Sequence, residues 1–188
     1  YRFLADGAEQ RTVDTPYGRP SAPITVGDVA GREVAFLPRH GRSHEFSPHT
    51  VPYRANLWAL RSLGVRKVLA PCAVGSLDGA AGPGTIAIPE QLVDRTFSRP
   101  STYFDGGGVH VSFADPYCPT LRAAAAPHAD RADSTMVVIE GPRFSTRAES
   151  RWFAAQGWDL VNMTGLPEAA LARELKLCYA SIALVTDL

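Results

Sequence analysis

The chain has 188 residues, of which 45% are hydrophobic and 20% charged, and its 19 basic residues balance its 19 acidic ones. This length and composition predict one globular domain with a hydrophobic core and exclude a disordered chain. The neutral charge argues against a nucleic-acid groove, and no apolar run approaches the roughly 20 residues of a membrane helix. We therefore expect a cytoplasmic protein with no nucleic-acid or membrane partner.

The three cysteines, Cys72, Cys118 and Cys178, lie far apart and form no C-x-x-C pair. This spacing favours reduced, buried thiols over a disulfide framework or a zinc ribbon. The chain begins without Met and stops directly after an apolar run, at Asp187 and Leu188. From this we expect that both ends of a longer protein are missing.

Short apolar runs rich in β-branched residues alternate with segments of helical periodicity. This alternation predicts an α/β fold, with a central mixed β-sheet flanked by helices in one domain. The predicted strands are residues 34–37, 68–70, 109–113, 136–139, 160–161 and 182–185.

Three helices are predicted with their ends. Residues 54–63 form the first, which stops at Gly64. Thr146 and Glu149 match a capping box at the start of the second, and Gly157 ends it. Pro167 opens the third, because a proline at the first helical position loses no hydrogen bond. Segments 79–84, 106–108 and 123–133 are rich in Gly, Ala, Pro and Asp and predict surface loops or frayed helix.

A dense polar cluster begins just after the predicted strand 34–37, with Arg39, His40 and Gly41. In open α/β sheets, ligands bind beyond the carboxyl ends of strands. A planar guanidinium, a ring donor and an exposed backbone would suit a phosphate or a carboxylate. The alternative is a solvated basic turn that binds nothing.

A metal site is a second interpretation of this cluster. His40 and His44 stand four residues apart, as zinc ligands on a helix would, and His49 follows, which together would fit a metal-dependent hydrolase. However, Gly41 and Pro48 disfavour a helix and no H-E-x-x-H motif is present, so we expect no metal.

Two further segments follow predicted strands. Small residues from Cys72 to Ser76 would let the backbone approach an anion closely. The segment from Asn162 to Gly165 offers a hydroxyl and free N–H groups at a helix start, which can also hold an anion. Each segment could equally be an ordinary turn.

Asp187 ends the apolar run 182–186. A carboxylate at the end of a buried strand is expected to be desolvated on one side, so that it could share a proton with a basic ligand. The alternative is a solvated strand end.

Six segments, in this order, together resemble the 5′-methylthioadenosine phosphorylases, a group within the trimeric purine nucleoside phosphorylases. They are residues 36–42, 53–60, 73–77, 139–150, 162–165 and 185–187. The resemblance implies the nucleoside phosphorylase fold over residues 1–188, without the N-terminal phosphate loop and the C-terminal helix of the family. It implies a cytoplasmic homotrimer in purine and methionine salvage that uses no cofactor. In the implied reaction, inorganic phosphate converts S-methyl-5′-thioadenosine to adenine and 5-methylthioribose 1-phosphate.

The resemblance also assigns site residues. Its phosphate site comprises Arg39, His40, Cys72, Ala73 and Thr164, with Cys72 where relatives often have Ser or Thr. Its nucleoside site comprises Asn162, Met163, Phe144, Asp187 and, from a neighbouring subunit, His110, while Ser145 lies where base contacts are tuned.

Asp187 would be the catalytic residue, because a carboxylate accepts a hydrogen bond from a 6-amino group but repels a 6-oxo group. The resemblance leaves other nucleosides open: a 5′-fluoro- or 5′-chloro-5′-deoxyadenosine, or a 6-oxopurine nucleoside. A catalytically weak protein that binds nucleoside and phosphate is the alternative from another class.

Overall fold

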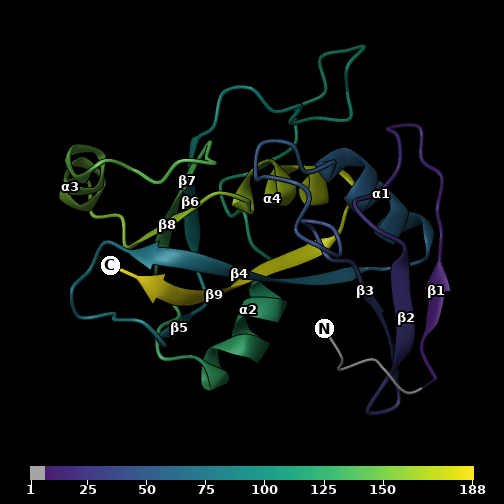
Figure 1. The fold of residues 1–188 in the computed structure, drawn as a ribbon, viewed down its shortest axis with the longest axis horizontal. Helices are drawn as coiled ribbons and strands as arrows, with labels where there is room; N and C mark the ends of the chain where they lie inside the picture. The colour runs from purple at the N-terminus through teal and green to yellow at the C-terminus, as the bar shows by residue number, and fades with distance from the viewer. Residues whose placement is uncertain (1–6) are drawn as a thin grey trace.

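Two β-sheets organise the fold of residues 7–188, the part of the chain that the computed structural model describes (Figure 1). The larger sheet has six strands in the order β5-β9-β4-β8-β7-β6. Their bounds are Lys67–Ser76 for β4, Ile86–Ala87 for β5, Gln91–Arg95 for β6, Thr135–Ile139 for β7, Leu160–Asn162 for β8 and Cys178–Asp187 for β9. The smaller, antiparallel sheet contains β1 (Glu9–Arg11), β2 (Ile24–Val29) and β3 (Arg32–Phe36).

The larger sheet is mixed, as predicted. Strand β4 pairs parallel with β9 and antiparallel with β8, while β6, β7 and β8 are parallel to one another. Helices α1 (Tyr53–Ser62) and α4 (Gly165–Glu174) lie on one side of the central strands, and α2 (Pro119–Ala125) and the 3₁₀ helix η1 (Ala126–His128) lie on the other (Figure 1). Helix α3 (Arg147–Ala155) stands near the ends of β7 and β8. The predicted α/β fold is confirmed.

The predicted helix ends are confirmed as well. Gly64, with φ of 91°, follows α1, and Gly157, with φ of 78°, follows α3. The Thr146 hydroxyl accepts from the backbone N–H of Glu149 at 3.2 Å, while the Glu149 carboxylate accepts from that of Thr146 at 2.6 Å. Leu166 is extended, so the regular part of α4 begins at Pro167.

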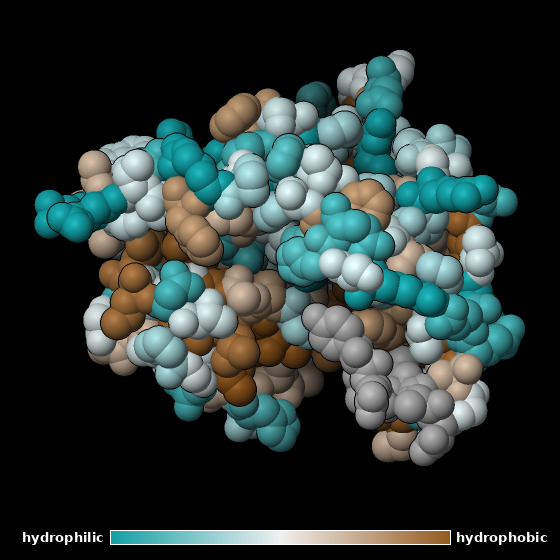
Figure 2. Space-filling view, in the orientation of Figure 1, coloured by the Kyte–Doolittle hydropathy of each residue, from teal (hydrophilic) through white to brown (hydrophobic). Residues whose placement is uncertain are grey.

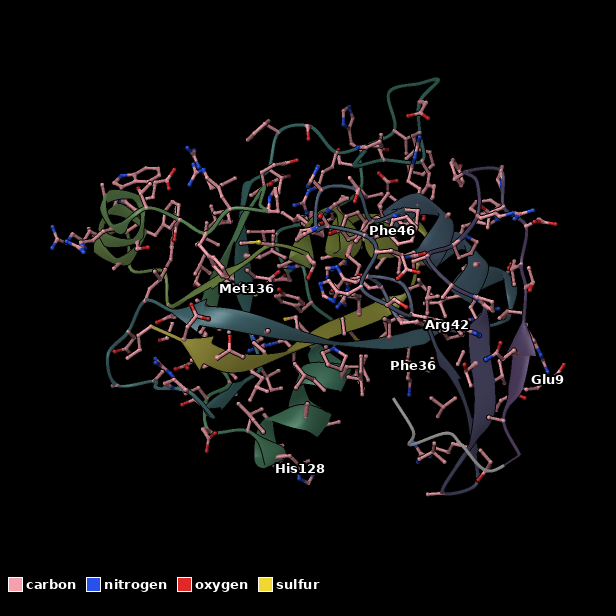
Figure 3. The ribbon with its side chains drawn as sticks, in the orientation of Figure 1. Glu9, Phe36, Arg42, Phe46, His128 and Met136 are labelled. Atoms are coloured by element: carbon pink, nitrogen blue, oxygen red, sulfur yellow. A yellow bond between two sulfur atoms is a disulfide. The ribbon has the colours of Figure 1, made fainter. Side chains whose placement is uncertain are left out.

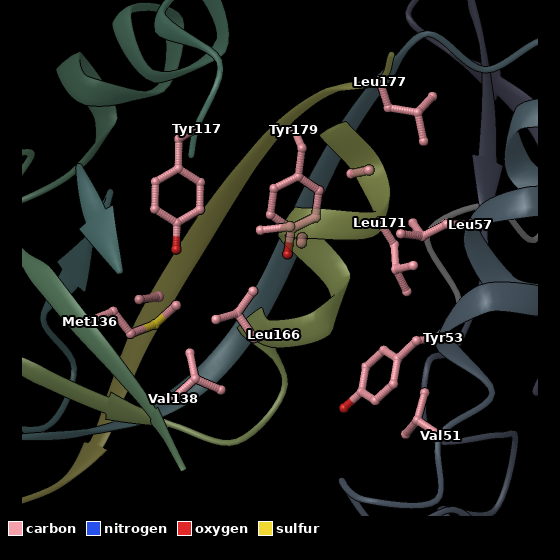
Figure 4. Packing of buried hydrophobic residues seen from close by; sticks show 14 of the residues in the cluster. Val51, Tyr53, Leu57, Tyr117, Met136, Val138, Leu166, Leu171, Leu177 and Tyr179 are labelled. Atoms are coloured by element: carbon pink, nitrogen blue, oxygen red, sulfur yellow. The ribbon is translucent and has the colours of Figure 1, made fainter. Parts of the chain in front are cut away.

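The hydrophobic core lies where α1 and α4 pack over β4 and β9. Leu57 of α1 points toward Leu171 of α4, and Tyr53 and Tyr179 belong to the same cluster (Figure 4). Ile24 of the smaller sheet belongs to the same core, so both sheets share one interior. This packing holds the carboxyl ends of β4 and β9 side by side, where Gly75 pairs with Asp187.

The strand predicted at 109–113 is wrong. These residues lie in an irregular loop that projects from the molecule, and Val109 is 54% exposed (Figure 1). Alternating β-branched residues predict a strand only where another strand can pair with them, and three glycines at 106–108 lead the segment away from the sheet.

The prediction of three reduced cysteines is also wrong, because Cys118 and Cys178 form a disulfide with their Cα atoms 5.1 Å apart. The backbone N–H of Cys118 donates to the carbonyl of Tyr179 at 2.8 Å, which brings the residue before α2 against the start of β9. The two cysteines are 60 residues apart in sequence, and nothing in the sequence indicated that they lie close together. Within residues 7–188, no helix has the length and apolar character to cross a bilayer.

Candidate functional site

The turn after β3 presents Arg39 and His40. The N–H of Gly41 donates to Pro38 at 2.9 Å, and the N–H of Phe46 donates to His40 at 3.0 Å. Gly41 has φ of 83°, and a Cβ there would lie 2.3 Å from the Glu45 carboxyl carbon. The positive φ favours glycine at this position, whereas the Glu45 side chain could move aside. Figure 3 labels Arg42 and Phe46 on this segment between β3 and α1.

Arg39 is held by a carboxylate that the sequence interpretation did not identify. Its Nε donates to Oε1 of Glu168 at 2.8 Å and its Nη2 to Oε2 at 2.9 Å, while Nη1 donates to the Pro71 carbonyl at 3.0 Å. Burial opposes the charge on Arg39, but the Glu168 carboxylate outweighs it and raises the pKa of the guanidinium. Arg39 is thus a fixed positive group beside the residue that precedes Cys72.

The ring of His40 is oriented by the backbone. Its Nδ1 lies 2.8 Å from the carbonyl oxygen of Phe46, and because a carbonyl only accepts, Nδ1 carries the proton. The ring stacks on His44 with centroids 4.4 Å apart. Burial lowers the pKa of His40, while the hydrogen bond to Phe46 opposes that change. The Nδ1 tautomer leaves Nε2 without a proton, so that Nε2 is a hydrogen-bond acceptor while the ring is neutral.

The two segments proposed as possible anion sites, residues 72–76 and 162–165, meet through Asn162. Its Nδ2 donates to the carbonyl of Ala73 at 3.2 Å, while its Oδ1 accepts from the N–H groups of Thr164 and Gly165 at 2.8 and 2.7 Å. Asn162 therefore joins the end of β4 to the start of α4. Its amide oxygen and one of its two amide N–H bonds are thus bound to backbone groups.

Cys72 lies in this same region, on β4. Its Sγ is 3.4 Å from the Ser181 hydroxyl of β9, and burial raises the pKa of the thiol. A thiol is a weak hydrogen-bond donor, so Cys72 would offer less to an anion than the Ser or Thr expected in the family.

The predicted nucleoside residues Met163, Phe144 and Ser145 lie around the ends of β7 and β8. A Cβ on Gly141 would lie 2.7 Å from the Met163 sulfur, so Gly141 and Met163 are in close contact. The Ser145 and Ser150 hydroxyls lie 2.8 Å apart. Phe144 is 74% exposed, which leaves its ring free to contact a ligand.

The buried side chain of Arg99 binds backbone carbonyls of both of these loops. Its side chain is 1% exposed, and its Nη1 lies 2.7 Å from the Met163 carbonyl and 2.5 Å from the Leu166 carbonyl. Its Nη2 donates to the Glu140 carbonyl. One buried cation thus bridges the loop after β7 and the segment before α4.

Asp187 lies at the end of β9, where a bulge shifts the β4–β9 register between Val74 and Gly75. A Cβ on Gly75 would lie 3.1 Å from Oδ2 of Asp187, and Thr186 donates to Oδ1 at 2.8 Å. The predicted one-sided burial is wrong, because Asp187 is exposed. Figure 2 shows apolar side chains gathered over this end of the sheet, and Leu184 and Leu188 are exposed there.

His110 is not brought to the other predicted residues by any contact within residues 7–188. It sits exposed in the loop 106–112, next to Val109. Over the same residues, no three His, Cys, Asp or Glu side chains form a group that could hold a metal ion.

The sequence interpretation missed the residues that position the site. Glu168 lies 129 residues from Arg39, Arg99 lies 64 residues from Met163, and Tyr179 binds a residue, Glu168, that was not itself identified. One signal was available for Glu168: an acidic residue directly after Pro167, in the first turn of a helix whose start was already assigned to an anion site.

Comparisons with known proteins identify the family of the chain. The sequence profile of the phosphorylase superfamily matches residues 3–188. The chain is 72% identical over its whole length to 73% of an S-methyl-5′-thioadenosine phosphorylase from Mycolicibacterium smegmatis. It is 62% identical, again over its whole length, to 72% of a purine nucleoside phosphorylase from Streptomyces coelicolor.

A solved structure supports the same assignment. A variant of adenosine/methylthioadenosine phosphorylase from Schistosoma mansoni, crystallised with methylthioadenosine, superposes with a TM-score of 0.94 at 37% identity. The match covers 99% of this chain and 75% of that one. Profile, sequence identity and fold agree over nearly all of the chain, which belongs to the phosphorylase superfamily.

Proposed function

We propose that the protein is a purine nucleoside phosphorylase that cleaves S-methyl-5′-thioadenosine with inorganic phosphate. A phosphate oxygen attacks C1′ as the C1′–N9 bond breaks, and the bonding electrons pass to the purine. The products are adenine, protonated from its surroundings, and 5-methylthioribose 1-phosphate. Phosphate itself is the nucleophile, so the reaction needs no cofactor and no metal.

The observation that carries this proposal is the pairing of β4 with β9. It places Asp187 beside Gly75, three residues along β4 from Cys72, and Arg39 binds the carbonyl just before Cys72. A cation for phosphate and a carboxylate for a purine thus lie along one strand. The site can stabilise an anion near C1′ and interact with the departing base.

Asp187 favours a 6-aminopurine. The carboxylate accepts a hydrogen bond from a 6-amino group and, when protonated, donates to N7, which makes adenine a better leaving group. A 6-oxopurine presents a second acceptor, which a carboxylate repels. The high identity to an S-methyl-5′-thioadenosine phosphorylase supports the same choice.

The first test compares nucleosides in phosphate buffer with the full-length protein. We expect adenine release from S-methyl-5′-thioadenosine at a higher kcat/KM than from 5′-chloro-5′-deoxyadenosine or adenosine, and little cleavage of inosine. Rapid cleavage of inosine with no adenine release would contradict the proposal. Binding of adenine without turnover would instead support the alternative of a catalytically weak binding protein.

The second test replaces the carboxylate. Asp187→Asn should lower kcat/KM for S-methyl-5′-thioadenosine by about a hundredfold and raise that for inosine, because a carboxamide can donate to O6. Asp28→Asn, near the exposed end of β2, is the matched control and should leave kcat/KM for both nucleosides unchanged. Equal losses on both nucleosides would argue against a role in base selection.

The proposal also covers the oligomeric state of the protein, its location in the cell and the role of His110. We expect a homotrimer that acts in the cytoplasm. In the trimer, His110 of one subunit would contact the 5′ end of the nucleoside bound to a neighbouring subunit. The exposed Val109 and Val111 beside His110 are consistent with contact to another subunit. Light scattering on the purified protein measures the mass and would contradict the trimer if it gave a monomer.

A further inference from the structure

Glu168 and Tyr179 form a buried hydrogen-bonded group with Arg39, outside every segment assigned to substrate. Glu168 lies in the first turn of α4, with its side chain 8% exposed, and Arg39 is 16% exposed. The Tyr179 hydroxyl donates to Oε2 of Glu168 at 2.7 Å. Both carboxylate oxygens are therefore occupied, one by Arg39 alone and one by Arg39 and Tyr179 together.

The bonds to Glu168 and Pro71 use three of the five N–H bonds of the guanidinium. Arginine has five N–H bonds in one plane. Glu168 accepts from Nε and from one N–H of Nη2, and the Pro71 carbonyl accepts from one N–H of Nη1. One N–H on each terminal nitrogen is left without a partner among residues 7–188. These two N–H bonds are charged donors of the kind that bind phosphate oxygens.

Three separate elements set this geometry. Arg39 follows β3, Glu168 belongs to α4, and Tyr179 belongs to β9, where its ring stacks on that of Tyr117 with centroids 6.1 Å apart (Figure 4). Burial raises the pKa of Tyr179, so the phenol stays protonated and can only donate to the carboxylate. The guanidinium cannot rotate without breaking the bidentate pair inside the protein.

We propose that Glu168 and Tyr179 are positioning residues that hold Arg39 so that its two free N–H bonds face the phosphate co-substrate. The inference rests on the proposed phosphorolysis. It assigns the affinity for phosphate, and not that for nucleoside, to a carboxylate that does not itself touch phosphate. Loss of either residue should therefore raise the KM for phosphate and leave the KM for nucleoside nearly unchanged.

Two variants test this inference. Glu168→Gln keeps the size of the side chain but leaves one oxygen to accept from two N–H groups, and it should raise the phosphate KM about tenfold. Tyr179→Phe removes one hydroxyl and should raise it about threefold. The nucleoside KM should stay within about twofold in both variants, because the purine end is untouched. Arsenate, tested in place of phosphate, should show the same increases.

Matched controls lie in the same part of the fold. Glu174 is on the same helix and accepts from the Thr102 hydroxyl and the Tyr103 N–H, both at 2.7 Å. Tyr103 donates its hydroxyl to the Arg54 carbonyl at 2.8 Å. Glu174→Gln and Tyr103→Phe should therefore lower thermal stability while the phosphate KM stays at the wild-type value.

The outcomes separate this inference from the proposed function. A folded Glu168→Gln variant with an unchanged phosphate KM, or with equal increases in both KM values, would overturn it. If that variant does not fold, Tyr179→Phe decides by the same criterion. If the wild-type protein releases no adenine, the proposed function fails, and calorimetry of inorganic phosphate binding to the same variants tests the positioning role separately.

Discussion

Gly75 shows how one position without a side chain can shape a site. It lies at the bulge where β4 meets the end of β9, with the Asp187 carboxylate on one side and Val161 of β8 on the other. A Cβ there would lie 2.9 Å from Cγ1 of Val161 and 3.1 Å from Oδ2 of Asp187. Since Val161 is held in the sheet, the carboxylate is the group that can move.

Gly75→Ala should therefore displace Asp187 and lower kcat/KM for the nucleoside about tenfold, while the phosphate KM changes little. Steady-state kinetics with each substrate varied in turn measures both kcat/KM for the nucleoside and the KM for phosphate. Gly79→Ala is the control, because a Cβ at Gly79 meets no atom within 4 Å. A Gly75→Ala variant as active as this control would show that the carboxylate is not positioned from this side.

At the level of single residues, the sequence singled out Arg39 and His40 as site candidates but not the residues that bind Arg39. Arg39 and His40 follow a strand directly, which is a local pattern. Glu168 lies 129 positions from Arg39, and an acidic residue in the first turn of a helix is common for reasons of the helix dipole alone. Only the folded structure shows that Glu168 binds Arg39 as well as lying in the first turn of a helix.

Helix α3 is the element whose start depends most clearly on local chemistry. The reciprocal hydrogen bonds of Thr146 and Glu149 satisfy two backbone N–H groups that the helix cannot satisfy itself. Arg143 adds two N–H bonds to the same carboxylate, each at 2.8 Å, and these lower the pKa of Glu149 to about 2. This end of the helix adjoins Ser145 and Phe144.

Thr146→Ala should lower the free energy of unfolding by about 1 kcal/mol, because the helix loses its side-chain cap. Urea denaturation monitored by circular dichroism measures the change. Thr146→Ser keeps a hydroxyl at the same position and should restore most of the loss. An alanine variant as stable as the serine variant would contradict a stabilising cap.

Elements with local signals were predicted, and elements that depend on distant partners were not. The ends of α1, α3 and α4 follow from Gly64, Thr146 and Pro167, each within a few residues of the helix. The apolar run at 109–113 has strand-like composition but no partner strand, so it forms a loop. The two-residue strand β5 depends entirely on its pairing with β9.

At the scale of the whole molecule, the Cys118–Cys178 disulfide joins α2 to the beginning of β9. The covalent loop that it closes contains β7, α3, β8 and α4, and so includes the loops around Met163 and Phe144. A bond across a loop of this length restricts the unfolded chain and favours the folded state. The thiol systems of a cytoplasm would keep both sulfurs reduced, so the redox state of this pair bears on the stability of the protein there.

Reduction of the disulfide should therefore lower the free energy of unfolding by about 2–4 kcal/mol. Thermal unfolding with and without dithiothreitol measures the effect. The Cys118→Ser, Cys178→Ser double variant should unfold at the temperature of the reduced wild type and show no response to the reductant. Cys72→Ser should keep the response, because Cys72 is not part of the disulfide. A wild type that is indifferent to the reductant would contradict a stabilising role.

Strand β4 also fixes a length. Its residues 72 and 75 belong to opposite ends of the proposed site, and three residues of extended chain span about 10 Å. Because β9 pairs with the strand from residue 72 to residue 75 and β8 pairs with it from residue 75, the span cannot stretch or shorten to suit a ligand. For inhibitor design, β4 is a rigid spacer: a compound that joins an anionic group to a 6-aminopurine can occupy both ends only if its own linker matches that distance.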